Sequence, residues 1–148
     1  MISEAEELFT TGKKLDIKIE LLTDSEAEKY INKSLNLFSP FKVTGHLGIG
    51  HNSIELPIDK WEFSYMEHLD EEGGYIFFDQ MRSMYKHTVV KIEDIRLLGK
   101  ILENSFGMEY FLTNEKTDFL IAVNWYVIEV AGTAKKRLEK LLVDAGMT

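Results

Sequence analysis

The chain has 148 residues, of which 45% are hydrophobic and 28% charged, and this balance is typical of a folded domain with one core rather than of a disordered chain. It contains no cysteine, which excludes disulfides, thiolate nucleophiles and cysteine-ligated metal sites. The formal net charge is −8, and because phosphate binding depends on clustered Lys and Arg, we expect no nucleic-acid partner.

The first forty residues predict two helices separated by a strand. Ser3 followed by Glu6 is a capping box, so a helix is expected that ends near Gly12. Residues 15–21 alternate apolar and polar side chains, as in a half-buried strand. Apolar residues then recur at helical spacing over about 25–38, until a proline forbids continuation.

The middle of the chain is less regular. The glycine-containing segment 41–57 predicts short strands joined by a tight turn, whereas residues 59–70 fit a helix and a strand equally well. Gly73 and Gly74 interrupt the chain before residues 75–78, an aromatic and aliphatic run typical of a buried strand. Residues 81–88 are expected to form a loop or a sheet edge.

A helix is predicted over residues 92–106, because five apolar side chains lie on one helical face. They are Ile92, Ile95, Leu98, Leu102 and Phe106. Gly107 is expected to end this helix. A strand over 108–113 and one or two strands over 118–131 follow, and Asn124 is expected to bend the second run into a hairpin.

A last helix is predicted from Thr133 to Gly146, with leucines facing inward. The sum is one α+β domain over residues 1–148, with a mostly antiparallel sheet whose last three strands form a meander, covered by three or four helices. The acidic start is unlike an export signal, and the longest apolar run, residues 119–130, is too short to cross a membrane. A cytoplasmic protein without membrane contact is therefore expected.

The negative charge is concentrated between Ser53 and Gln80, a range that contains eight acidic residues and one basic residue. Aromatic residues precede an acidic run there, a combination found in interfaces, because aromatic side chains supply contact area and charges steer a partner of opposite sign. The candidate partner-binding residues are Trp61, Tyr65, Glu67, Asp70, Glu71 and Glu72. A core role for the aromatic residues is the alternative, and the acids could also form a solvated loop or serve general acid–base catalysis. Trp125 and Tyr126 pose the same choice between core and interface.

Other motifs carry no complete site. The glycines of Gly45–His51 lack the spacing of a dinucleotide or phosphate loop, so a plain turn and a ligand loop remain alternatives. Three of the four histidines, His46, His51 and His68, lack the spacing of metal ligands. Ser83–Lys86 matches a Ser-x-x-Lys element without its companions, as chance allows. We expect no catalytic residue, metal or cofactor.

The C-terminal half, from residues 75–78 through 92–106 to 119–128, resembles small acidic immunity proteins of bacterial polymorphic toxin systems. The resemblance rests on the order of elements and on a strand, asparagine, aromatic, strand sequence around Asn124. It implies a non-enzymatic protein that neutralises a basic toxin by filling its cleft with an acidic surface. The alternatives are a ligand-binding protein or enzyme that uses Gly45–His51, and a structural subunit that forms an oligomer.

Overall fold

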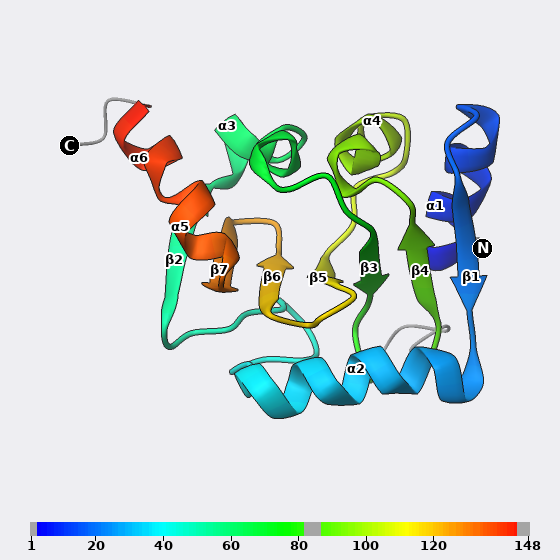
Figure 1. The fold of residues 1–148 in the computed structure, drawn as a ribbon, viewed down its shortest axis with the longest axis horizontal. Coiled ribbons are helices and arrows are strands. Elements are labelled where there is room, and N and C mark those ends of the chain that lie inside the picture. The colour runs from blue at the N-terminus through cyan, green and yellow to red at the C-terminus, as the bar shows by residue number, and fades with distance from the viewer. Residues whose placement is uncertain (1–2, 82–86, 145–148) are drawn as a thin grey trace.

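The computed structural model describes residues 3–81 and 87–144, and it consists of a seven-stranded antiparallel sheet between two helical layers (Figure 1). The strands are β1 (Ile19–Leu22), β2 (Ser53–Pro57), β3 (Gly74–Phe77), β4 (Val89–Ile92), β5 (Tyr110–Asn114), β6 (Phe119–Val123) and β7 (Val127–Gly132). The helices are α1 (Glu4–Lys14), α2 (Asp24–Phe38), α3 (Ile58–Trp61), α4 (Leu98–Glu103), α5 (Ala134–Leu138) and α6 (Lys140–Asp144), with 3₁₀ turns η1 (Tyr65–His68) and η2 (Ile95–Leu97).

The strand order across the sheet is β1-β4-β3-β5-β6-β7-β2. The last three strands are neighbours in sequence and in space, which confirms the predicted α+β class and its C-terminal meander. The two earliest strands form the two edges, β1 beside β4 and β2 beside β7. Pro57, the last residue of β2, pairs with Val127, the first of β7, so α3 begins next to the β6–β7 turn.

Each face of the sheet has its own core. On one face, α2 and the segment that follows it cover aromatic strand residues, among them the stacked pair Phe77 and Phe111. On the other face, α1, η1, α4 and α5 pack on alternate residues of the same strands, including Ile76 and Tyr110. Both faces of the central strands are therefore buried, which explains their continuous apolar runs.

The two predicted N-terminal helices are present. Ser3 caps α1, because its Oγ accepts a hydrogen bond from the backbone N–H of Glu6 at 3.2 Å. The helix passes through Gly12 and ends at Lys14. A Cβ at Gly12 would lie 3.0 Å from a methyl group of Ile19, so close packing, rather than a helix stop, accounts for this glycine. Ser39 adopts a left-handed conformation, φ 42°, at the end of α2.

Several predicted boundaries are wrong. The helix expected over 92–106 is shorter at both ends, because Ile92 belongs to the buried strand β4 and Phe106 is 44% exposed. Asn104, rather than Gly107, caps α4. The strand expected over 15–21 begins only at Ile19.

The segments that the sequence left open are also settled. Residues 41–50 form an irregular loop with one isolated bridge, between Lys42 and Gly48, and only β2 is a strand between residues 41 and 57. Residues 59–70 contain the end of α3 and the 3₁₀ turn η1, joined by a turn at 62–64, and no strand. The Ser83–Lys86 motif, most of the loop predicted at 81–88 and Gly146 lie outside the described residues. Over the described ranges, no helix has both the length and the apolar character needed to span a membrane.

Candidate functional site

A buried glutamate holds one end of the glycine loop, residues 44–50. Glu129 lies on β7 with 8% of its surface exposed, and its two carboxylate oxygens accept the backbone N–H groups of Ile49 and Gly50, each at 3.1 Å. Gly48 has no room for a side chain, because a Cβ there would lie 2.7 Å from Glu129 Oε2. Close approach to this carboxylate therefore accounts for a glycine at position 48.

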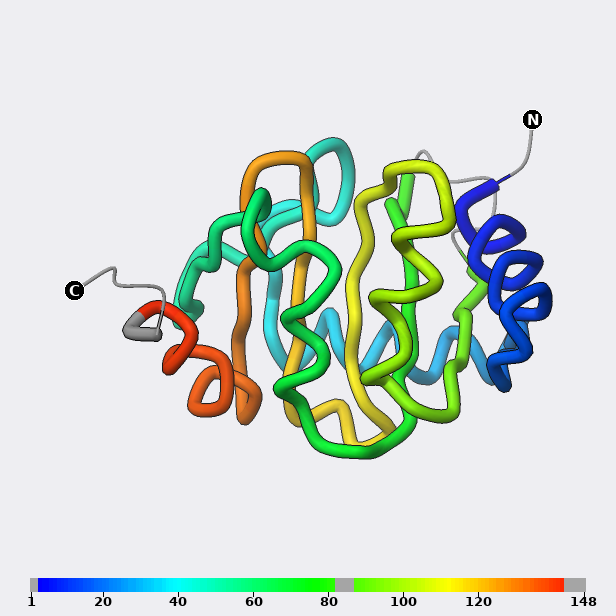
Figure 2. The backbone as a smooth tube through the Cα atoms, turned by 90° about the horizontal axis from the view of Figure 1, so that it is seen from above, coloured from blue at the N-terminus to red at the C-terminus, as the bar shows by residue number. Residues whose placement is uncertain are grey.

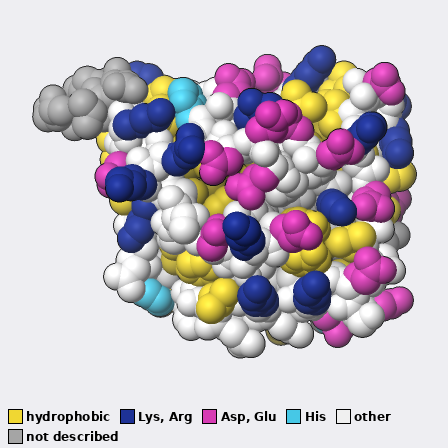
Figure 3. Space-filling model, in the orientation of Figure 1, with side chains coloured by type: hydrophobic (Ala, Val, Ile, Leu, Met, Phe, Trp, Pro, Cys, Tyr) yellow, Lys and Arg dark blue, Asp and Glu magenta, His cyan; other side chains and the backbone are white. Residues whose placement is uncertain are grey.

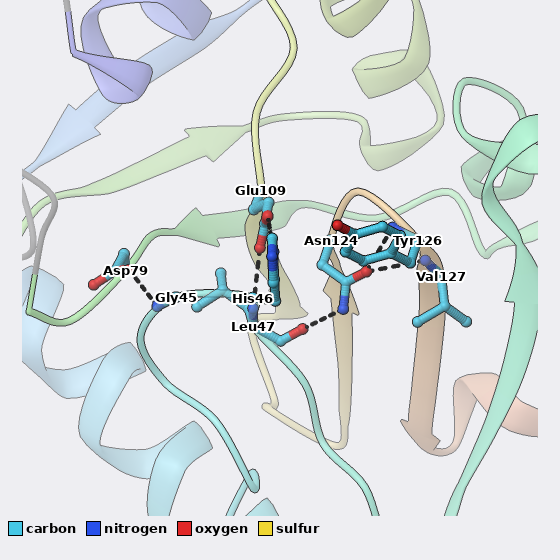
Figure 4. Close-up of polar contacts among 8 residues, drawn as sticks. All are labelled: Gly45, His46, Leu47, Asp79, Glu109, Asn124, Tyr126 and Val127. Atoms are coloured by element: carbon cyan, nitrogen blue, oxygen red, sulfur yellow. Dashed lines mark hydrogen bonds and ion pairs between the residues drawn. The ribbon is translucent and has the colours of Figure 1, made fainter.

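Two further carboxylates hold the other end of the loop (Figure 4). Glu109 accepts the backbone N–H of Leu47 at 3.0 Å through Oε1, and its Oε2 lies 2.8 Å from His46 Nδ1. Asp79 accepts the N–H of Gly45 at 2.8 Å. A loop that binds phosphate needs free N–H groups, but these donate to the chain's own carboxylates, whose charge repels an anion. The geometry therefore favours the plain-turn interpretation of Gly45–His51.

Asn124 joins the β6–β7 turn to the glycine loop. Its Oδ1 accepts the backbone N–H groups of Tyr126 and Val127, at 2.8 and 3.0 Å, and its Nδ2 donates to the carbonyl of Leu47 at 2.9 Å (Figure 4). The predicted bend at Asn124 is thus confirmed. A buried amide with all three of these bonds fixes the turn rigidly against the loop.

Four exposed rings belong to the segments that meet at this junction, and we term them the aromatic platform: His46, Phe106, Trp125 and Tyr126. Trp125 is 50% exposed and Tyr126 71% exposed, so both lie on the surface rather than in the core. The ring of Tyr126 meets His46 edge to face at a centroid distance of 5.0 Å. Trp125 covers Gly107, where a Cβ would lie 3.0 Å from Trp125 Cζ3, and Phe106 is adjacent in sequence.

The aromatic residues predicted to bind a partner are placed differently. Tyr65 is completely buried, and its hydroxyl lies 2.8 Å from that of Tyr110, so the prediction that Tyr65 contacts a partner is wrong. Burial raises the pKa of both phenols, which keeps them neutral. Trp61 is half-buried and packs against the core, with its ring edge to face with that of His68. Phe63, by contrast, is 38% exposed.

The predicted acidic run is partly neutralised within the chain. Asp70 pairs with Arg137, Glu71 pairs with Arg96 at 3.1 Å, and Glu72 accepts a hydrogen bond from Asn114. Glu67 is exposed and has no ion-pair partner among the described residues. Figure 3 shows one face of the molecule, on which acidic and basic side chains alternate. Residues 67–72 therefore do not form a single acidic patch on this fold.

A pocket of about 200 Å³ lies beside this run. Its polar lining has both signs of charge and includes Asp70, Glu72, Asn114, Asp118 and Arg137. Burial raises the pKa of Glu72, an effect that the Asn114 hydrogen bond opposes and the neighbouring Asp118 and Asp70 reinforce. Among residues 3–81 and 87–144, no group of three or more His, Asp or Glu side chains is arranged to hold a metal ion.

Within the described part of the chain, residues 55–67 contain several carboxylates without an ion-pair partner. Glu55, Asp59, Glu62 and Glu67 have no ion-pair partner in the described part of the chain, and Lys60 is the one base among them. Burial raises the pKa of Glu62, so its negative charge is incompletely hydrated. The acidic α3 segment is defined as residues 55–67. Because β2 ends opposite the start of β7, α3 begins beside the β6–β7 turn, whereas the last part of the segment, η1, contacts α5, which follows β7 at the opposite end of the sheet (Figure 2).

Sequence reasoning had no means of assembling the aromatic platform, because its members come from three segments that only the fold brings together. The strand, asparagine, aromatic, strand pattern at Asn124 was the one local signal.

Comparison of the chain with protein-family models, curated proteins and solved structures finds no match.

Proposed function

We propose that this protein is a non-enzymatic binding protein whose acidic α3 segment docks on a basic protein. The observation that carries the proposal is the set of four carboxylates without an ion-pair partner, described above, beside an exposed Phe63. Uncompensated charge on a partner surface speeds association with a partner of opposite sign, and adjacent aromatic area slows dissociation. The raised pKa of Glu62 adds to the argument, because a nearby cation would relieve the cost of holding that charge.

Binding rather than catalysis is supported by how the polar groups are used. His46 and Glu109, the acid and base pair closest to general acid–base chemistry, bond to each other and to the glycine loop. Asp79 and Glu129 also support that loop. These groups fix the conformation of a surface loop, and a binding protein requires a surface of fixed conformation.

The resemblance to immunity proteins makes a bacterial toxin the partner that we propose. A toxin that acts on an anionic substrate has Lys and Arg in its cleft, and the α3 segment would occupy that cleft in place of the substrate. Inhibition would then follow from occlusion, with no chemical step on this chain.

The test is affinity capture from the source cell at low salt, with matched charge variants. Asp59→Asn combined with Glu62→Gln removes two charges from the α3 segment, and Glu26→Gln combined with Glu115→Gln removes two exposed charges elsewhere. We expect the wild type and the control to recover the same basic protein, the α3 variant to recover much less, and about 0.5 M salt to abolish recovery. Equal recovery by both double variants would refute the acidic docking surface.

The immunity role has a separate test. A basic protein encoded beside this one should stop growth when it is expressed alone and be tolerated when this protein is expressed with it. Loss of that protection in the α3 variant, and not in the control, is the expected result. Protection that is unchanged in the α3 variant would contradict the proposal.

A further inference from the structure

Hydrogen bonds within the chain hold the backbone that carries the aromatic platform. Asn124 fixes the backbone that carries Trp125 and Tyr126, and Glu109 fixes His46 and the chain next to it. Trp125 is supported from below by Gly107. A preformed aromatic surface loses little conformational entropy on binding, and such surfaces provide most of the energy of protein interfaces.

Acidic segments lie next to this platform at two points of the backbone. Pro57 pairs with Val127, so α3, which contains Asp59, begins beside the β6–β7 turn. At the second point, Glu7 accepts the backbone N–H of Phe106 at 3.2 Å, which places the acidic first turn of α1 next to the platform. Rings with an acidic border attract a cation, because the negative faces of the rings and the carboxylates act in the same direction.

We infer that the aromatic platform is the docking site for an arginine side chain of the basic partner, an inference that rests on the proposed function. A guanidinium is planar and weakly hydrated, so it stacks on Trp125 or Tyr126 while its edge donates to a carboxylate. A lysine ammonium is a compact, strongly hydrated charge and gains less from the rings. Nucleic-acid bases also stack on aromatic side chains, but the acidic border repels their phosphates.

The experiment compares two labelled probes of equal charge, hexa-arginine and hexa-lysine, by fluorescence anisotropy at low salt. Trp125→Ala and Tyr126→Ala each remove one exposed ring, Tyr126→Leu keeps apolar area without the ring face, and Leu97→Ala is the control at an exposed leucine outside the platform. We expect each alanine variant to bind hexa-arginine about two- to fivefold more weakly, since that is the range of an exposed cation–π contact. The affinity for hexa-lysine should fall less in these variants, and Leu97→Ala should bind both probes as tightly as the wild type does.

The outcomes separate this inference from the proposed function. If the platform variants bind hexa-arginine as tightly as wild type, while Asp59→Asn/Glu62→Gln weakens both probes, the arginine site is refuted and the acidic surface stands. If the platform variants weaken hexa-arginine and the charge variant changes nothing, the arginine site stands and the acidic surface fails. Equal binding of the two probes by the wild type, no binding of hexa-arginine, or tighter binding of a single-stranded oligonucleotide would each overturn the inference. Thermal unfolding of each variant confirms that it is folded, and Tyr126→Leu replaces Tyr126→Ala if that alanine variant is not.

Discussion

Replacing Glu129 by glutamine should destabilise the protein because it breaks the main anchor of the glycine loop. Each carboxylate oxygen of Glu129 accepts a backbone N–H, from Ile49 and from Gly50. In Glu129→Gln, one oxygen becomes an NH₂ group that faces another donor, so one charge-assisted bond is lost and one buried N–H is left unsatisfied. Such a bond contributes about 1.5–3 kcal/mol, and we expect the free energy of unfolding to fall by about 2 kcal/mol.

The chain offers a matched control. Glu55 is the cross-strand partner of Glu129 on β2, but it is exposed. Glu55→Gln should change the stability by less than about 0.5 kcal/mol, whereas Glu129→Gln should lower the melting temperature by about 4–8 °C for a chain of this length. Urea unfolding and amide hydrogen exchange of Ile49 and Gly50 measure the two effects. Equal midpoints for the two variants, or unchanged exchange at both amides, would refute the anchoring role.

Three further changes test the packing and the titrating groups. Gly99→Ala should lower the free energy of unfolding in urea by about 3 kcal/mol, because the new Cβ would collide with the carbonyl oxygen of Phe63. Gly73→Ala should be tolerated, because its Cβ would lie 3.5 Å from the nearest backbone carbonyl oxygen, that of Ile92. Burial raises the pKa of Tyr65 and Tyr110, so the phenols of the unfolded chain lose their protons at a lower pH than those of the folded chain. The free energy of unfolding should therefore be highest below about pH 10 and fall as the pH rises further. An unchanged free energy of unfolding at high pH would contradict the buried pair. Asp118→Asn should lower the raised pKa of Glu72, as followed by NMR titration, because it removes one of the neighbouring charges. An unchanged pKa would contradict a contribution from Asp118.

The parts of the fold that the sequence predicted are those with local causes. The capping box at Ser3, the helical spacing of α2 and the turn at Asn124 each depend on residues within a few positions of one another. The strand β4 was missed because Ile92 continues the apolar spacing of the following helical turn, and only pairing with β1 and β3 makes it a strand. Periodicity within one segment carries no information about such partners.

The candidate site was predicted less well, for the same reason. The acids at positions 70 and 71 lie next to each other in the sequence, but Arg137 and Arg96, which neutralise them, come from distant segments. In the sequence, Tyr65 resembles an interface residue, but in the fold its hydroxyl bonds to that of Tyr110 in the core. The exposed position of Trp125 and Tyr126 depends on how the hairpin sits on the glycine loop, which involves residues far away in the chain.

The placement of the earliest strands at the two sheet edges has a consequence for biosynthesis. A nascent chain that has emerged from the ribosome only as far as α2 has made β1 but not its partner β4, and β2 waits even longer for β7. Glu109 and Glu129, which close the glycine loop, also leave the ribosome late. The segments that precede residue 57 therefore cannot complete their native pairing before the β6–β7 hairpin has been synthesised, so formation of this sheet depends on contacts distant in the sequence.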